Sequence, residues 1–195
     1  MDVNFSPALA YASGSTAERQ QGYTLIELFI GLAIAAIVVG MALPSFAGLM
    51  HNNRRTTAIN TLSSTLNYAR SEAIKRSQPA VICKGNPMDG CDKARQWHDG
   101  WIVFVDENGD KTWSGDEPLL WTQDALAREQ TLEWSAFPSS NYVIYYPNGS
   151  ASSNGTFTFC DNRGPTEARA LIIARSGRVR VSDKNAKDES LQCPA

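Results

Sequence analysis

The stretch Gly22-Tyr-Thr-Leu-Ile-Glu27 leads into a hydrophobic run that begins Leu28-Phe-Ile-Gly-Leu-Ala-Ile34. The residues from Leu28 to Met50 include no charged side chain. As a helix, this segment would be about 34 Å long, which is enough to cross a lipid bilayer. The sequence therefore predicts a transmembrane helix over residues 23–50.

Residues 1–22 are hydrophilic and end in Gln-Gln-Gly. A secretory signal peptide has its apolar run before the cleavage site. Here the apolar run follows the candidate site, so cleavage after Gly22 would leave the hydrophobic helix on the mature protein. We therefore expect residues 1–22 to be a leader of another kind.

The order of these residues resembles the N-terminal signature of type IV pilins, with Gly before the cut, an aromatic residue after it and Glu27 close behind. The resemblance implies that a prepilin peptidase cleaves after Gly22 and that Tyr23 becomes N-methylated. It assigns Glu27 and the helix-kinking Pro44 to filament assembly, with Glu27 pairing with the N-terminal amine of a neighbouring subunit. A carboxylate inside lipid costs several kcal/mol unless it is paired. The alternative is that Glu27 reaches the lipid headgroups.

The rest of the chain predicts an α+β fold. Between Asn53 and Ser77, apolar residues recur at spacings of three and four, which indicates an amphipathic helix over residues 51–78 that ends at Pro79. Residues 79–195 predict a β-rich globular domain with a basic C-terminal region, packed against that helix as an antiparallel sheet. The expected strands are Ala80–Cys83, Trp101–Val105, Leu119–Thr122, Thr131–Ala136, Tyr142–Tyr146, Thr156–Cys160, Ala170–Ala174 and Arg178–Ser182.

The four cysteines are an even number behind an export signal, which indicates disulfides. Four cysteines allow three pairings. We favour Cys83 with Cys91, as a short local loop, and Cys160 with Cys193, which would hold the C-terminal tail. Zinc is the weaker alternative, because the chain has no C-x-x-C pair and no histidines at a matching spacing.

Three further motifs resemble the FimT/GspH group of minor pilins and pseudopilins. They are Asp99-Gly-Trp-Ile-Val-Phe-Val-Asp106, Tyr146-Pro-Asn-Gly149, and Ala168-Arg-Ala-Leu-Ile-Ile173 leading into Gly177-Arg-Val-Arg180. The resemblance covers residues 22–193. Some FimT-like members bind DNA in natural transformation through a C-terminal Gly-Arg-x-Arg motif, whereas GspH-like members work in type II secretion.

The segment from Cys160 to Lys187 carries five Arg and two Lys against three acidic residues, in a chain with a net charge of −2. Alternation along a strand puts Arg178 and Arg180 on one face, roughly 7 Å apart, close to the phosphate spacing of DNA. We expect these two arginines and Gly177 to bind double-stranded DNA, with Arg175, Lys184 and Lys187 widening the patch. The alternative is an edge strand whose charges prevent aggregation.

The segment Asp106–Glu117 has acidic residues at the first and twelfth positions, as an EF-hand loop does. Lys111 occupies the position of the usual glycine, and we predict no flanking helices. We therefore favour an Asp/Asn-rich hairpin turn over a calcium site and predict no metal.

We expect a minor pilin with no enzymatic activity and no cofactor. It would reside in the bacterial inner membrane with its globular domain in the periplasm, and then in a pilus at the cell surface. The expected partners are other major and minor pilins, the prepilin peptidase, double-stranded DNA and inner-membrane lipid. The alternative function is a structural tip or priming subunit of a pilus or type II secretion system, with no ligand of its own.

Overall fold

The computed structural model describes residues 22–113 and 115–194, apart from the side chains of residues 42–45. The predicted leader, except Gly22, and the predicted kink at Pro44 therefore lie outside the described residues. The chain divides into two compact units, Met1–Phe46 and Ala47–Ala195. Each unit is considered by itself.

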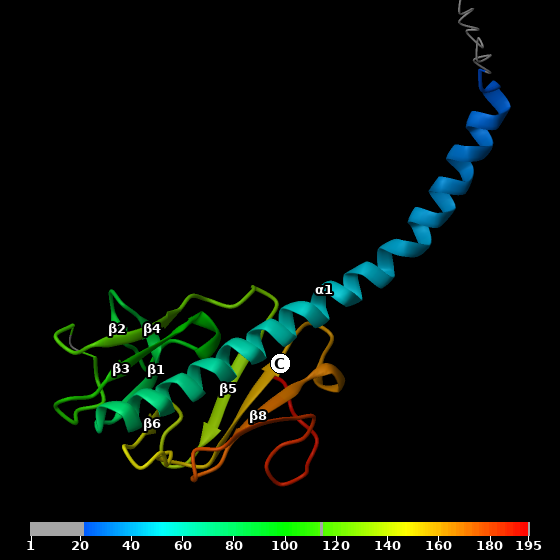
Figure 1. The fold of residues 1–195 in the computed structure, drawn as a ribbon. Coiled ribbons are helices and arrows are strands. Elements are labelled where there is room, and N and C mark those ends of the chain that lie inside the picture. The colour runs from blue at the N-terminus through cyan, green and yellow to red at the C-terminus, as the bar shows by residue number, and fades with distance from the viewer. Residues whose placement is uncertain (1–21, 114, 195) are drawn as a thin grey trace, which may run out of the picture. The chain divides into compact units, whose positions relative to one another are not determined.

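One long helix precedes a set of antiparallel strands (Figure 1). The elements are α1 (Leu25–Arg76), β1 (Ala80–Asn86), β2 (Gly90–Cys91), the 3-10 turn η1 (Trp97–Asp99), β3 (Trp101–Val105), β4 (Leu119–Gln123), β5 (Thr131–Ala136), β6 (Tyr142–Tyr145), β7 (Gly155–Cys160), the 3-10 turn η2 (Pro165–Glu167), β8 (Arg169–Ile173) and β9 (Val179–Ser182).

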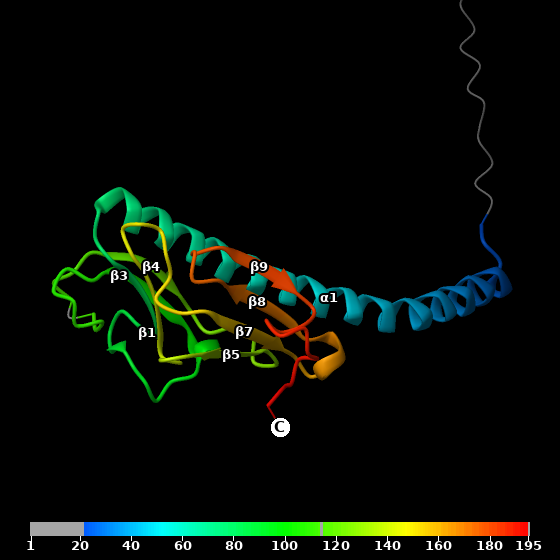
Figure 2. The ribbon, with the colours of Figure 1, turned by 90° about the horizontal axis from the view of Figure 1, so that it is seen from below.

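The strands form two sheets rather than one. The first has the order β2-β1-β3-β4, and β6 also pairs with β1. The second has the order β5-β7-β8-β9, so β9 is an edge strand, as Figure 2 shows. All the pairings are antiparallel. The predicted α+β class is confirmed, and the division into two sheets is an addition that the strand pattern alone did not predict.

The C-terminal part of α1 lies over both sheets and closes the main core. Its buried face consists mainly of apolar residues at spacings of three and four, as the amphipathic pattern predicted, together with Thr65 and Glu72. The apolar residues are Ala58, Ile59, Leu62, Leu66, Ala69 and Ala73. They pack with Trp101 and Val103 of the first sheet and with Phe157 and Leu171 of the second. One helix face therefore joins the two sheets into a single hydrophobic core.

The helix ends at Arg76, three residues before Pro79. Ser77 has a left-handed backbone (φ 55°), and its N–H donates to the Ile74 carbonyl at 3.3 Å. A left-handed residue after the last helical turn is a common way for a helix to stop. The residue before a proline is also disfavoured in the helical region. Pro79 therefore disfavours helix in the residues that precede it. The observed helix ends slightly before the predicted end at residue 78.

Both favoured disulfides, Cys83–Cys91 and Cys160–Cys193, are present. The first closes a hairpin that contains β2, a two-residue strand that the sequence pattern did not predict. A Cβ placed on Gly85 would lie only 1.9 Å from the Gly90 carbonyl oxygen, so the two backbones pack in direct contact there. Such a short strand depends on its covalent link and its glycines rather than on a pattern of alternating side chains.

Candidate functional site

Thr24 caps the N-terminus of α1. Its hydroxyl oxygen accepts the Glu27 N–H at 3.3 Å, and its carbonyl accepts the Leu28 N–H at 3.2 Å. A threonine followed three residues later by glutamate is the sequence of a capping box. The helix start is therefore fixed one residue after Thr24, and Tyr23 precedes the cap.

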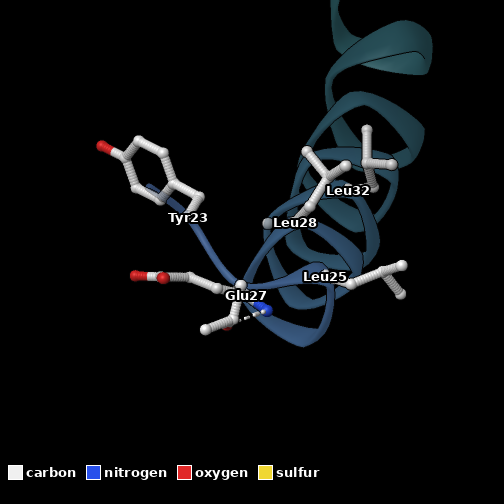
Figure 3. Close-up of a pocket in the computed structure, with 7 residues that line it drawn as sticks. Tyr23, Leu25, Glu27, Leu28 and Leu32 are labelled. Atoms are coloured by element: carbon white, nitrogen blue, oxygen red, sulfur yellow. Dashed lines mark hydrogen bonds between the residues drawn. The ribbon is translucent and has the colours of Figure 1, made fainter. Parts of the chain in front are cut away.

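The side chains of Tyr23 and Glu27 extend to the same side of the helix start, away from Leu25 (Figure 3). Together with Leu28, Gly31 and Leu32 they line a surface hollow formed by this segment alone. A Cβ on Gly31 would have no atom within 4 Å, so the helix surface is open there. This open surface beside a carboxylate is suited to close packing by another helix.

The first part of α1 is apolar on every side. Its large hydrophobic side chains from Leu25 to Val39 are all more than half exposed. A helix that is hydrophobic all round is stable in lipid or inside an assembly, but not in water. This helix is long and apolar enough to cross a membrane.

The predicted arginine pair lies at the outer edge of the second sheet. Arg180 is exposed and pairs with Ile172 across β9 and β8. Arg178, also exposed, precedes β9, and its carbonyl accepts the Ala174 N–H at 2.9 Å. Val179 packs on the main core, so strand alternation directs both arginines to the face of the sheet opposite α1. In the part of the chain that the structure describes, no carboxylate lies within ion-pair distance of either guanidinium.

The remaining predicted basic residues differ in their pairing. Lys184 forms an ion pair with Asp188 at 3.2 Å. Arg175 and Lys187 are exposed, and no ion pair of either one occurs among the described residues. Among the described residues, Arg175, Arg178, Arg180 and Lys187 are therefore exposed without an ion pair, and Lys184 is partly neutralised.

Arg163 is one of the five arginines in the segment from Cys160 to Lys187, but its guanidinium is hydrogen-bonded within the protein. Its guanidinium donates to both carboxylate oxygens of Asp161, one at 2.6 Å, and to Asn52 of α1 at 2.8 Å. Arg55 of α1 donates to the Glu167 carboxylate at 2.9 Å. These contacts join α1 to the β7–β8 connection, so the usable positive charge of the segment is smaller than its composition indicates.

Gly177 combines a turn with a close packing contact, and nothing in the sequence indicated that contact. Its φ of 80° closes the β8–β9 turn, with its N–H donating to Ala174 at 2.8 Å. A Cβ there would lie 2.1 Å from the Gly149 carbonyl oxygen and 2.8 Å from Nε of Arg70. The Arg70 guanidinium of α1 donates to the carbonyls of Gly149 and Ser176, at 2.8 and 3.2 Å. Two of the motif glycines thus lie against one helix side chain.

No sequence signal identified Arg70 as the residue that holds these two turns. It is one of several charged residues between Asn53 and Ser77. Only the approach of the two turns to α1 distinguishes it from the others.

Comparisons with known proteins agree with this fold. The model of the family "Type II transport protein GspH" matches residues 58–177, and that of the "Prokaryotic N-terminal methylation motif" matches residues 18–43. The pilin-like protein PilA1 of Thermus thermophilus is 26% identical over 167 residues, covering 83% of this chain and 98% of that protein.

Two kinds of solved structure also resemble this chain. The type IV minor pilin FimU of Pseudomonas aeruginosa aligns with a TM-score of 0.55 at 23% identity, covering 71% of this chain and 96% of FimU. The minor pseudopilin EpsH of Vibrio cholerae aligns with a TM-score of 0.50 at 11% identity, covering 66% of this chain and 96% of EpsH. At these levels of identity, the two similarities concern the fold.

The match of the GspH family model covers more than half of the residues, so the chain belongs to the GspH family. It is a minor pilin or pseudopilin with an N-terminal methylation motif and a helix that is long and apolar enough to cross a membrane. The family match ends at Gly177 and does not include Arg178 or Arg180.

Proposed function

We propose that this chain is a minor type IV pilin that binds DNA non-specifically through Arg178 and Arg180 and that it acts in DNA uptake. One observation carries the proposal: two exposed arginines share one face of an edge strand with no carboxylate partner among the described residues. A guanidinium presents parallel N–H donors that match a phosphate group. Arg175, in the turn before them, is also exposed and has no ion pair among the described residues.

The rigid setting of the arginines also supports this function. The turn before them is fixed by Gly177 and by the contacts of Arg70. Ordering long side chains on a flexible loop would reduce affinity, whereas a strand of a packed sheet is already ordered. The surface offers no pattern for base reading, so binding should depend on phosphate contacts and on salt.

The proposal includes the route that brings the domain to DNA. By resemblance, a prepilin peptidase would cleave after Gly22, and the inner membrane would hold the chain before assembly. The domain Ala47–Ala195 would then face the periplasm and be displayed at the cell surface in a pilus. Several subunits or neighbouring pilins would add avidity to weak individual contacts.

The test is fluorescence anisotropy with a labelled DNA duplex and the full chain in detergent micelles at low salt. Arg178→Gln/Arg180→Gln should weaken binding at least about tenfold and reduce the slope of log affinity against log salt by about two. The matched control Arg54→Gln/Lys75→Gln removes two exposed charges from α1 and should bind as the wild type does. Equal binding by wild type and the arginine variant would leave the purely structural role, in a pilus or a type II secretion system, as the function.

A further inference from the structure

The β3–β4 hairpin contains two buried carboxylates. Asp106 is 4% exposed and Glu117 is 7% exposed. Within residues 22–113 and 115–194, neither carboxylate forms an ion pair with a basic side chain. Buried charges are normally paired or bound to a metal, because removing them from water is costly. This pair of acids therefore needs a cation that the side chains around it do not supply.

One oxygen of this pair has no partner. Oε1 of Glu117 accepts the Glu107 N–H at 2.9 Å, which holds the carboxylate at the start of the loop, next to Asp106 in the chain. Oε2 of the same carboxylate is buried and has no hydrogen-bond donor among the described residues. An unpartnered buried oxygen is expensive, and a cation is the natural ligand for a carboxylate oxygen.

The loop presents oxygen-bearing residues in a calcium-binding order. If Asp106 is position one, Asn108 is position three, Asp110 is position five, and the Thr112 carbonyl and Glu117 are positions seven and twelve. Oδ1 of Asp106 accepts hydrogen bonds from the N–H groups of Gly109 and Lys111, at 3.0 and 3.3 Å. These bonds fold the loop backbone around the Asp106 carboxylate.

Two features of the sequence argued against a calcium site: the lysine at position six and the lack of flanking helices. The structure accounts for both. Position six of such a loop is normally glycine because the chain turns sharply there. Lys111 occupies it and adopts the left-handed conformation itself, with φ 64°. The missing helices are replaced by β3 and β4, whose base is closed by the Val105 N–H donating to the Pro118 carbonyl at 3.1 Å.

We infer that this loop binds Ca²⁺ between Asp106 and Glu117, with the side-chain oxygen of Asn108 and the carbonyl of Thr112 completing the shell. Among the described residues, no three His, Cys, Asp or Glu side chains converge, so amide and carbonyl oxygens have to supply part of the coordination. With few charged ligands, the affinity should resemble that of extracellular calcium modules, on the order of 10⁻⁴–10⁻³ M. Mg²⁺ demands a stricter octahedral shell and should bind more weakly.

Trp113 provides a direct readout. Its indole Nε1 donates to the Glu117 carbonyl at 3.1 Å, so the ring lies beside the inferred site. Tb³⁺ added to the full chain in detergent should give emission sensitised by tryptophan, and Ca²⁺ should displace it at tenfold lower concentration than Mg²⁺. Trp113→Phe should lose most of this emission, while Ca²⁺ still raises the thermal unfolding midpoint.

Three variants make the test specific. Glu117→Gln should weaken Tb³⁺ and Ca²⁺ binding at least tenfold. Asn108→Ala, on an exposed residue whose change leaves the buried pair intact, should weaken it severalfold. Asp116→Asn removes an equal charge from an exposed neighbour and should bind as the wild type does. Absence of sensitised emission and of any Ca²⁺ stabilisation in the wild type, or unchanged binding by both ligand variants, would overturn the inference. None of these outcomes depends on DNA binding.

Discussion

At the scale of single residues, Gly177 meets two separate requirements. Its backbone is left-handed, a conformation that costs an ordinary residue roughly 1–2 kcal/mol. It also lies so close to Gly149 that an added Cβ would be 2.1 Å from a carbonyl oxygen. Gly109 has the same φ of 80° but has no atom within 4 Å of its Cβ position. The two glycines therefore separate the conformational requirement from the packing requirement.

We predict that Gly177→Ala lowers the free energy of unfolding by roughly 3 kcal/mol or more. The new side chain would force the Gly149 backbone to move, and residue 177 would also be held in a strained conformation. Gly109→Ala should cost only about 1–2 kcal/mol, from the φ angle alone. Urea unfolding of the two variants, followed by circular dichroism, measures the difference. Equal losses would show that the contact between the two turns and Arg70 contributes nothing to stability.

At the scale of elements, the cluster between α1 and the β7–β8 connection makes stability depend on pH. Hydrogen bonds from Arg163 hold the pKa of Asp161 below its usual range, although burial opposes them. Hydrogen bonds from Arg55 lower the pKa of Glu167 in the same way. A carboxyl whose pKa is lower in the folded state stabilises that state above its unfolded pKa. This contribution disappears as the pH falls through the folded pKa.

The corresponding prediction concerns Asp161→Asn. At pH 7 it should lower the free energy of unfolding by about 1–2 kcal/mol, since the Asp161 side chain is only 4% exposed and its bonds are charge-assisted. The difference from wild type should be constant down to about pH 5 and shrink below about pH 4, near the unfolded pKa of aspartate. Denaturant unfolding between pH 7 and pH 3 measures it.

Asp89→Asn is the control for this series. Its side chain is 65% exposed and faces Arg95 at 3.5 Å. Exposed pairs of this kind contribute little. A difference between wild type and Asp161→Asn that stays the same at pH 3 would contradict the assigned role of the charge.

At the scale of the whole molecule, α1 serves two environments. Its N-terminal part exposes apolar side chains on all sides, whereas the part within Ala47–Ala195 buries one face in the core. The stability of the globular unit is thus built without Glu27 or its neighbours. Assembly and folding should respond to different substitutions.

We predict that Glu27→Gln leaves the thermal unfolding of the globular unit unchanged. The same variant should reduce incorporation into filaments by at least about tenfold, because it removes the charge proposed to pair with a neighbouring amine in an apolar setting. Immunoblots of sheared filaments and of the membrane fraction measure this effect. Glu129→Gln, on a half-exposed carboxylate of the globular unit, should assemble normally. Normal assembly of Glu27→Gln would show that the pairing is not needed.

Much of the fold could be predicted from local patterns. Spacings of three and four located the buried face of α1 from Ile59 to Ala73, and β3 and β5 begin and end where expected. The cysteine spacing led to both disulfides. These features succeed because period and turn chemistry are properties of short segments. β2 was missed because two residues are too few to show a period.

The sequence by itself determined the class of the protein, the helix with its apolar and amphipathic parts, and the presence of a strand beside the two arginines. Each of these depends on residues close together in the chain. The edge position of that strand came from the structure. Only the tertiary structure decided which basic side chains have no partner among the described residues. Arg163 and Arg70 carry the same side chain as Arg178, yet Arg163 donates to Asn52 of α1 and Arg70 donates from α1 to the Gly149 carbonyl, both far away in sequence. The burial of Glu117 and Asp106 was likewise set by tertiary packing. Such packing acts between segments that are distant in the sequence, so a local pattern cannot predict it.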